Sequence, residues 1–207
     1  MKTKNKTLHT SLCKALFIIA TFLISSNTAF SQKPGVKYTG TIEGDVLFGA
    51  FEKTGSVLTH HGIAYNNWKA SVGTGLDFYR YRTVPVFLNV QRSFKLGKTQ
   101  SFVEASGGVN IAHPTESEKL RNNWWGIWWP SIGDTLNFNN GYYSRLGVGL
   151  VLTPKSKIKL TTNAGWSYKT ISERYEEYVY DGVLVRKEIH TNRYGLNRWY
   201  VGIGISF

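Results

Sequence analysis

Trp199-Tyr-Val-Gly-Ile-Gly-Ile-Ser-Phe207 ends the chain and sets the pattern for the rest of it. Side chains alternate across a β-strand. One face therefore carries Trp199, Val201, Ile203, Ile205 and Phe207, and the other carries Tyr200, Gly202, Gly204 and Ser206. An apolar face that ends on an aromatic residue is typical of a strand that meets lipid. The alternative for these nine residues alone is an ordinary amphipathic edge strand.

The first 31 residues have the pattern of a cleaved export signal. Basic residues Lys2, Lys4, Lys6 and Lys14 come first, the apolar run 15–24 follows, and Ala29-Phe-Ser31 has the spacing of a cleavage site before Gln32. The apolar run is about half the roughly 20 residues that a membrane-spanning helix needs. Cys13 lies inside the signal without the small preceding residue of a lipidated cysteine, so a lipid anchor is not expected. The mature chain then has no cysteine, and disulfides and thiol chemistry are excluded.

Residues 32–207 are expected to form one domain. The whole chain has 25 basic and 13 acidic residues, and removal of the four signal lysines leaves 21 basic residues and a charge of +8. Such a charge can indicate a nucleic-acid partner. No basic run or basic helix accompanies it, so we expect no nucleic-acid binding. Basic residues in the lumen and loops of an exported barrel explain the charge equally well.

Alternation of period two recurs about every dozen residues between turn signals, which predicts an all-β chain. Eight strands are expected, at residues 38–50, 57–65, 68–79, 84–94, 101–112, 136–152, from 157 onward, and up to Phe207. Short turns at Asn66, Gly97 and Pro154 alternate with longer connections, among them an insert at 113–135. The prediction is an eight-stranded, antiparallel, up-and-down transmembrane β-barrel, with the short turns and both mature termini on the periplasmic side.

A soluble barrel would place its apolar faces around a ligand. Here the apolar stripes are nearly free of charge for about 10 residues per strand, the length that a tilted strand needs to cross hydrocarbon. Aromatic residues fall at both ends of the stripes, as two girdles would. These are Tyr65, Trp68, Phe94 and Phe207 at one end and Phe78, Tyr142, Trp166 and Tyr168 at the other. The membrane form is therefore favoured.

Three stretches give the chain a family resemblance. They are Gly62-Ile-Ala-Tyr-Asn-Asn-Trp68, Val72-Gly-Thr-Gly-Leu-Asp-Phe-Tyr79 and Val84-Pro-Val-Phe-Leu-Asn-Val-Gln-Arg-Ser-Phe94. The pattern resembles the small outer-membrane β-barrel proteins of Bacteroidetes, and the last strand resembles the carboxy-terminal assembly signal of such barrels, with Phe207 as its terminal residue. The resemblance implies fold, location, and outer-membrane lipid and the barrel-assembly machinery as partners. It implies no active-site residues and no cofactor.

The polar faces predict a charged lumen. The residues assigned inward are Glu43, Asp45, Lys69, Asp77, Glu104, Arg145, Lys159, Lys169 and Arg198. An eight-stranded barrel is only wide enough for side chains to fill it. Because buried charges need paired partners, we expect a plugged lumen rather than a small-solute channel.

A lipid A-modifying enzyme is the alternative from another class. It would need a Ser activated by a His with an acid to orient that His, and His60, His61, His113 and His190 are the candidates. His60 and His61 are adjacent and point to opposite faces of a strand, so they cannot act together. The chain has no Gly-x-Ser-x-Gly motif and no metal-ligand spacing. We therefore expect no enzyme, no metal and no cofactor.

The insert contains four of the seven tryptophans, Trp124, Trp125, Trp128 and Trp129. Interfacial anchoring at the barrel rim is the favoured interpretation. The alternative is a contact surface for a surface protein or a saccharide partner.

The final hairpin has the most detailed prediction. Asp181-Gly182 is a strong signal for a two-residue type I′ turn. A tight turn there would pair Tyr180 with Val183, Glu177 with Arg186, Glu176 with Lys187 and Ile158 with Ile205. Both strands are longer than a membrane requires, so residues 171–192 are expected to protrude as a paired ribbon.

Overall fold

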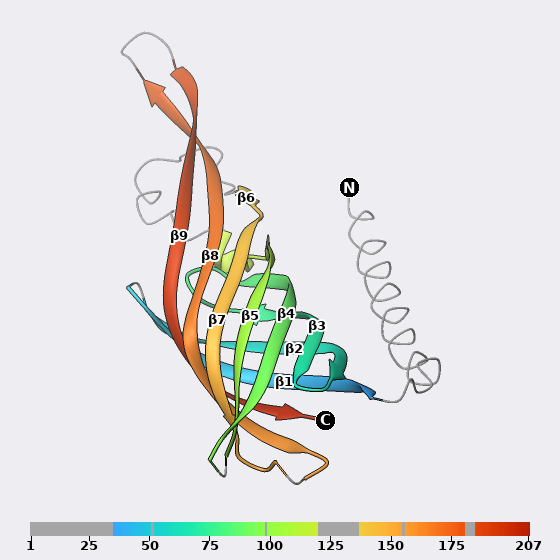
Figure 1. Ribbon diagram of the computed structural model, residues 1–207. Helices are drawn as coiled ribbons and strands as arrows, with labels where there is room; N and C mark the ends of the chain where they lie inside the picture. Colours follow the sequence, from blue (N-terminus) through green and yellow to red (C-terminus); the bar gives the residue numbers. More distant parts are fainter. Residues whose placement is uncertain (1–34, 51, 98, 120–136, 155, 181–184) are drawn as a thin grey trace.

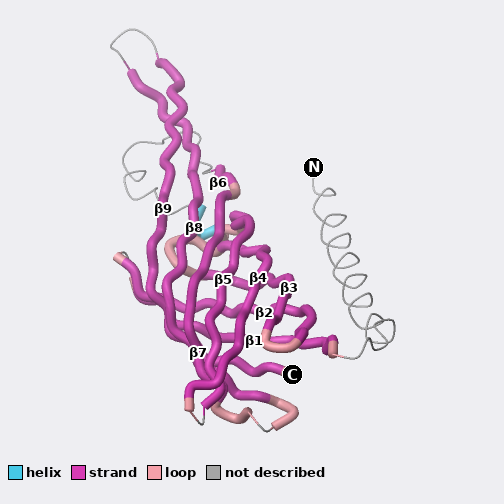
Figure 2. Tube along the Cα trace, in the orientation of Figure 1, coloured by secondary structure: helices cyan, strands magenta, loops and turns pink. Residues whose placement is uncertain are grey.

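The computed structural model describes residues 35–207 except for 51, 98, 120–136, 155 and 181–184 (Figure 1). The strands are β1 (Val36–Gly49), β2 (Lys53–Tyr65), β3 (Trp68–Asp77), β4 (Thr83–Leu96), β5 (Thr99–Ala112), β6 (Asn137–Asn139), β7 (Gly141–Val151), β8 (Lys159–Tyr180) and β9 (Val185–Ser206), with one short helix, α2 (Glu116–Lys119). Figure 2 shows that most of the described chain is β-strand. No helix in these ranges is long and apolar enough to span a membrane.

The long strands form a closed antiparallel ring. Each pairs with its neighbour in chain order, apart from the three-residue β6, and β9 returns to β1. The closing seam runs from Thr41 opposite Ser206 to Gly49 opposite Arg198. Closure removes the unpaired edges that an open sheet would expose. The predicted eight-stranded antiparallel barrel is therefore confirmed.

The two shortest connections, β2–β3 and β4–β5 with two residues each, lie at one end of the barrel, and the long insert after β5 begins at the other. The β2–β3, β4–β5 and β7–β8 turns lie at the first end, together with Phe207, which exchanges backbone hydrogen bonds of 2.9 and 3.0 Å with Gly40. Asn66 and Gly97 adopt the positive φ values, 53° and 61°, that tight turns require. We call this the short-turn end and the opposite one the loop end.

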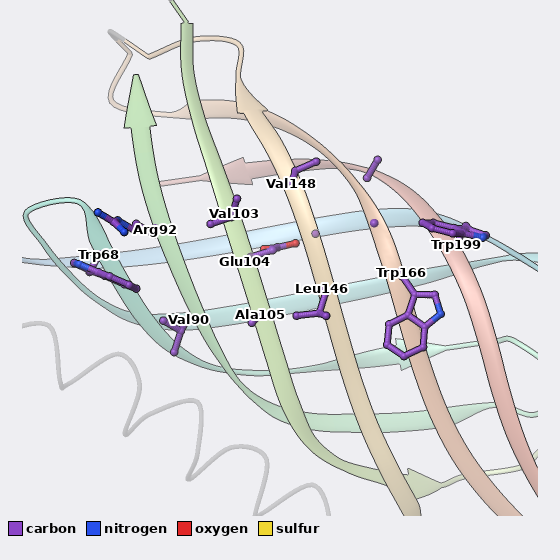
Figure 3. Close-up of a pocket in the computed structure, with 13 residues that line it drawn as sticks. Trp68, Val90, Arg92, Val103, Glu104, Ala105, Leu146, Val148, Trp166 and Trp199 are labelled. Atoms are coloured by element: carbon purple, nitrogen blue, oxygen red, sulfur yellow. The ribbon is translucent and has the colours of Figure 1, made fainter. Parts of the chain in front are cut away.

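The wall of the barrel is apolar outside and polar inside. Every long strand carries exposed apolar residues on its outer face; Leu88, Ile203 and Val72, for example, are 66%, 61% and 58% exposed. Figure 3 shows part of this outer wall, where Val103 and Ala105 on β5 flank Glu104. Val103 is 40% exposed and Glu104 only 7%, so neighbouring residues face opposite sides as the period-two pattern predicts.

Two predicted strands are shorter than expected because side chains take over their backbone hydrogen bonds. The third ends at Asp77 rather than Tyr79, since Asp77 Oδ1 accepts a 2.9 Å bond from the Tyr79 amide and Arg80 follows with φ of 65°. The sixth divides into β6 and β7 around Asn140, whose Oδ1 accepts the amide of Ala112 at 3.0 Å. Short polar side chains favour turns in this way.

The insert after β5 begins with one helical turn that the alternating pattern did not predict. Thr115 Oγ1 accepts the amide of Glu118 at 3.2 Å, and Glu118 Oε2 accepts the amide and the hydroxyl of Thr115. This reciprocal arrangement is a capping box. The predicted Trp124, Trp125, Trp128 and Trp129 surface lies outside the described residues.

Strands β8 and β9 continue beyond the other strands as a two-stranded ribbon (Figure 1). Their pairing extends without interruption from Lys159 opposite Ser206 to Tyr180 opposite Val185. The predicted register is therefore wrong by two residues. Four residues lie between the paired Tyr180 and Val185, whereas the predicted turn places two between Tyr180 and Val183. Glu177 faces Glu188 and not Arg186, while Arg186 faces Val179. A shift of two preserves the alternation, so the inward and outward assignments are unaffected.

Candidate functional site

The lumen is filled by polar and charged side chains from all parts of the ring. Those less than 9% exposed include Thr41, Glu43, Asp45, His60, Lys69, Ser71, Asp77, Asn89, Glu104, Arg145, Asn163, Lys169 and Arg198. Among the predicted lumen residues only Lys159, at the short-turn end, is partly exposed. The other eight predicted charges are buried, four acids against four bases. This balance permits their enclosure, since an uncompensated charge would not be tolerated there.

The Arg145 cluster consists of Arg145 with Glu43, Asp45 and Glu104. Arg145 on β7 forms ion pairs with Glu43 and, at 3.0 Å, with Asp45, both on β1. Its Nη2 lies 3.6 Å from Glu104 Oε1 on β5. The guanidinium also stacks 3.7 Å from the ring centroid of Tyr200 on β9. One cation therefore joins three carboxylates and one aromatic ring across the lumen.

The Asp77 cluster consists of Asp77, Lys169 and Arg198, from β3, β8 and β9. Asp77 Oδ1 accepts a 2.9 Å bond from Lys169 Nζ, and its Oδ2 accepts from Arg198. Lys169 also donates to Thr83 Oγ1 at 3.0 Å and to the carbonyl of Tyr81 at 3.2 Å. Here cations outnumber carboxylates, the reverse of the Arg145 cluster. With Lys69 added, the two clusters contain four basic and four acidic side chains, so their formal charges cancel.

Lys69 and several neutral polar side chains fill the lumen toward the short-turn end. Lys69 Nζ donates to Thr41 Oγ1 at 2.6 Å. His60 Nδ1 lies 3.1 Å from Ser71 Oγ, and Asn89 Nδ2 donates to Ser106 Oγ at 2.9 Å. The His60–Ser71 and Asn89–Ser106 bonds join neighbouring strands. Lys69 on β3 instead reaches past β2 to Thr41 on β1.

A cluster of buried aromatic and aliphatic residues lies at the loop end of the lumen. Tyr79 is fully buried, and Leu196, Ile171 and Tyr81 are 1%, 2% and 5% exposed in the same cluster. Phe138 packs on Tyr81 with ring centroids 4.9 Å apart. Tyr79 and Tyr81 belong to the β3–β4 connection, so this loop folds inward over the charged interior. Alternation does not predict this cap, because the loop lies outside any strand.

Glu173 joins that loop to the ribbon. Its carboxylate accepts hydrogen bonds from Tyr81 at 2.8 Å, Tyr194 at 2.6 Å and Asn192 at 3.0 Å. Burial raises the pKa of Glu173, but the donors from Asn192, Tyr194 and Tyr81 outweigh it and hold the pKa below the ordinary 4.5. The pKa of Tyr81 is raised by burial and by its bond to Glu173. Glu173 was not among the predicted site residues, although its inward position follows from the pattern of β8.

The histidine pair separates as predicted. His60 is buried in the lumen, whereas His61 is only partly buried on the outer wall, where it stacks on Tyr38. Their placement on opposite faces of β2 is as predicted. His60 does reach a serine, Ser71, but both side chains are enclosed, with 4% and 6% of their surface exposed. In the described part of the chain no cluster of three His, Cys, Asp or Glu residues could hold a metal ion.

Phe207 lies on the outer wall at the short-turn end. Its ring is 6.3 Å from that of His61, and it covers Gly40, where an added Cβ would come within 2.6 Å of the ring. The glycine thus leaves the space that the terminal ring occupies beside the β1–β9 seam.

Comparison with known proteins concerns the fold. No family model matches the chain, and no curated protein matches it. The solid-state NMR structure of outer membrane protein AlkL in DMPC bilayers is similar, with a TM-score of 0.47 and 8% identity over 84% of this chain and 89% of that chain. The crystal structure of outer membrane protein OprG from Pseudomonas aeruginosa has a TM-score of 0.39 and 13% identity over 85% of this chain and 97% of that chain.

Proposed function

We propose that the chain is an integral outer-membrane β-barrel with a plugged lumen, and that it has a structural or surface-binding role through its loops. The observation that carries this proposal is the inverted polarity of the closed ring. Charged side chains are buried inside, while Leu88, Val148 and Ile203 are at least 60% exposed outside. Only lipid makes such an exterior favourable, and closure satisfies the backbone groups that lipid cannot.

Membrane insertion has a direct test. Cells expressing the full chain should hold it in the outer-membrane fraction, with an electrophoretic mobility that changes on heating. The short-turn end would then face the periplasm, where Phe207 would serve barrel assembly. The export signal with cleavage near Ser31 and the relationship to the Bacteroidetes barrels are parts of the same proposal. A chain recovered as soluble periplasmic protein would contradict it.

The plugged lumen rests on the Arg145 and Asp77 clusters and on the cap above them. Tyr79, Lys169 and Arg198 are each no more than 1% exposed, which supports a lumen without an open path. Planar-bilayer recordings should therefore show no stable, sizeable conductance. A steady open state in the wild-type chain would favour the small-solute channel instead.

Surface binding concerns the insert that contains Trp124, Trp125, Trp128 and Trp129. Clustered exposed aromatic residues mark contact sites for proteins or saccharides. Replacement of all four by Ser, followed by surface cross-linking and pull-down, distinguishes the two roles. Loss of a specific partner with an intact barrel supports binding, whereas loss of barrel stability alone supports an anchor at the membrane interface.

The enzymatic alternative is less favoured. Among the described residues His60 contacts a serine, Ser71, at 3.1 Å, but both groups are enclosed in the lumen. A lipid substrate would have to enter through the wall or the cap. Mass spectrometry of lipid A from strains with and without the gene should show the same acyl pattern, and a changed pattern would reinstate the enzyme.

A further inference from the structure

A pocket of about 370 Å³ lies on the outer wall at the loop end of the apolar stripe. Its walls include Phe48, Lys53, Trp166, Asn197 and Trp199. Strand pairing places Lys53 opposite Phe48, Phe48 opposite Trp199, and Trp199 opposite Trp166. Four strands therefore present one row of three aromatic rings that ends in a cation. We call this the rim pocket.

The charge of Lys53 is available at this pocket. Lys53 is exposed, and its Nζ lies 5.9 Å from the centroid of the Phe48 ring. The neighbouring Glu52 is directed elsewhere, because its Oε1 accepts a hydrogen bond from the backbone amide of Arg80 in the β3–β4 loop. Within the described residues no carboxylate forms an ion pair with Lys53.

Two arginines lie farther along the same outward face, beyond the pocket. Arg193 faces Ser172, and Arg174 faces Thr191, so the two arginines are diagonal neighbours on the exposed side of the ribbon. Arg193 lies six residues beyond Trp199, about 20 Å along β9. Neither arginine has an ion-pair partner among the side chains that the structure describes. The apolar wall below the row thus gives way to a polar face above it, with two arginines at its far end.

We infer that the rim pocket binds the phosphorylated headgroup of an outer-leaflet lipid. The aromatic rings of Trp166, Trp199 and Phe48 suit the glycerol or sugar and the first carbons of the acyl chains, since such rings prefer the boundary between hydrocarbon and headgroups. The Lys53 ammonium and the Asn197 amide supply donors, which suit the acceptor oxygens of a phosphate.

This inference depends on the membrane placement proposed above, and the test separates the two. The full chain is reconstituted in phosphatidylcholine vesicles that contain one tenth phosphatidic acid or, as the uncharged match, diacylglycerol. After gentle release, native mass spectrometry counts the lipids that stay bound. We expect phosphatidic acid to be retained in preference to both other lipids, and inorganic phosphate not to displace it.

Lys53→Gln should reduce this preference about fivefold, the effect of one basic residue near a charged membrane surface. Lys53→Arg should preserve it, and Lys95→Gln, an exposed lysine at the short-turn end, is the matched control. Equal retention of all three lipids, equal losses in Lys53→Gln and Lys95→Gln, or displacement by free phosphate would overturn the lipid site. Heat-modifiable mobility of each variant shows that the barrel is folded. A chain that does not enter vesicles contradicts the proposed function itself, whereas an inserted chain without lipid preference contradicts only this inference.

Discussion

The lumen and the ribbon contain parts of the same two strands, β8 and β9, but different contacts hold them. Inside the lumen, Lys169 and Arg198 both reach Asp77 on the opposite side of the ring. In the ribbon each strand pairs with the other, and Glu173 adds one connection to the β3–β4 loop through Tyr81. Enclosed charges must find partners across the barrel. Beyond Arg174, β8 pairs with β9 alone, and this pairing continues the register of the barrel wall without interruption.

The largest expected effect is in the lumen. Arg145→Met should lower the free energy of unfolding by about 3–5 kcal/mol, because three buried carboxylates lose their shared cation. Urea unfolding in lipid vesicles, followed by tryptophan fluorescence, measures this. Arg92→Met removes an exposed arginine 5.2 Å from the Trp68 ring and should cost no more than about 1 kcal/mol. Similar losses for both variants would contradict the charge-paired plug.

The Asp77 cluster should respond asymmetrically. Asp77→Asn leaves Lys169 and Arg198 without a carboxylate and is expected to cost about 3 kcal/mol. Lys169→Met leaves the Asp77–Arg198 pair intact and removes the excess cation, so its cost should be nearer to 1 kcal/mol. The same unfolding measurement compares them. Equal costs would mean that the two cations do not share one acceptor in the way that the structure shows.

A smaller effect is expected where the ribbon meets the loop. Glu173→Gln should cost about 1.5 kcal/mol at pH 7, because three hydrogen bonds to a charged acceptor become bonds to a neutral one. The pKa of Glu173 is lower in the folded chain than the ordinary 4.5, so its contribution is fully present above pH 4.5 and is lost as the pH falls through the lower folded value.

Unfolding of the wild type and of Glu173→Gln at pH 7 and at several values below 4.5 checks this dependence. The difference between the two chains should shrink as the pH falls. A difference that stays constant would show that the carboxylate charge is not what joins the ribbon to the loop.

The inside and outside of the wall could be predicted from sequence because alternation has a period of two. Whether a residue faces in or out depends only on its position along its own strand. Val103 and its neighbour Glu104, one exposed and one buried, show that this position is enough. The set of buried lumen charges could be predicted for the same reason. Lys159 differs, since it is the first residue of β8 and is partly exposed.

The pairing of those charges could not be predicted. Arg145 meets Glu43 and Asp45 about 100 positions away in the chain, and such contacts depend on how the closed strands are staggered around the ring. The cap was also missed, since Tyr79 and Tyr81 lie in a loop whose inward path follows from the Asp77 bond to the Tyr79 amide. Hydrogen bonds of this kind leave little signal in an alternating pattern.

The smallest expected effect tests the register of the ribbon, where the sequence-based prediction is wrong. The structure pairs Ser172 with Arg193, whereas a two-residue turn at Asp181-Gly182 would pair Ser172 with Thr191. The double variant Ser172→Cys, Arg193→Cys should therefore cross-link readily on mild oxidation with little change in stability. Its control, Ser172→Cys, Thr191→Cys, should cross-link poorly, because diagonal positions are about 7 Å or more apart. Cys13 belongs to the expected signal segment, so no other thiol competes in the mature chain. Stronger cross-linking in the control would restore the tight turn and would move every ribbon pair, Arg174 opposite Thr191 included, by two residues.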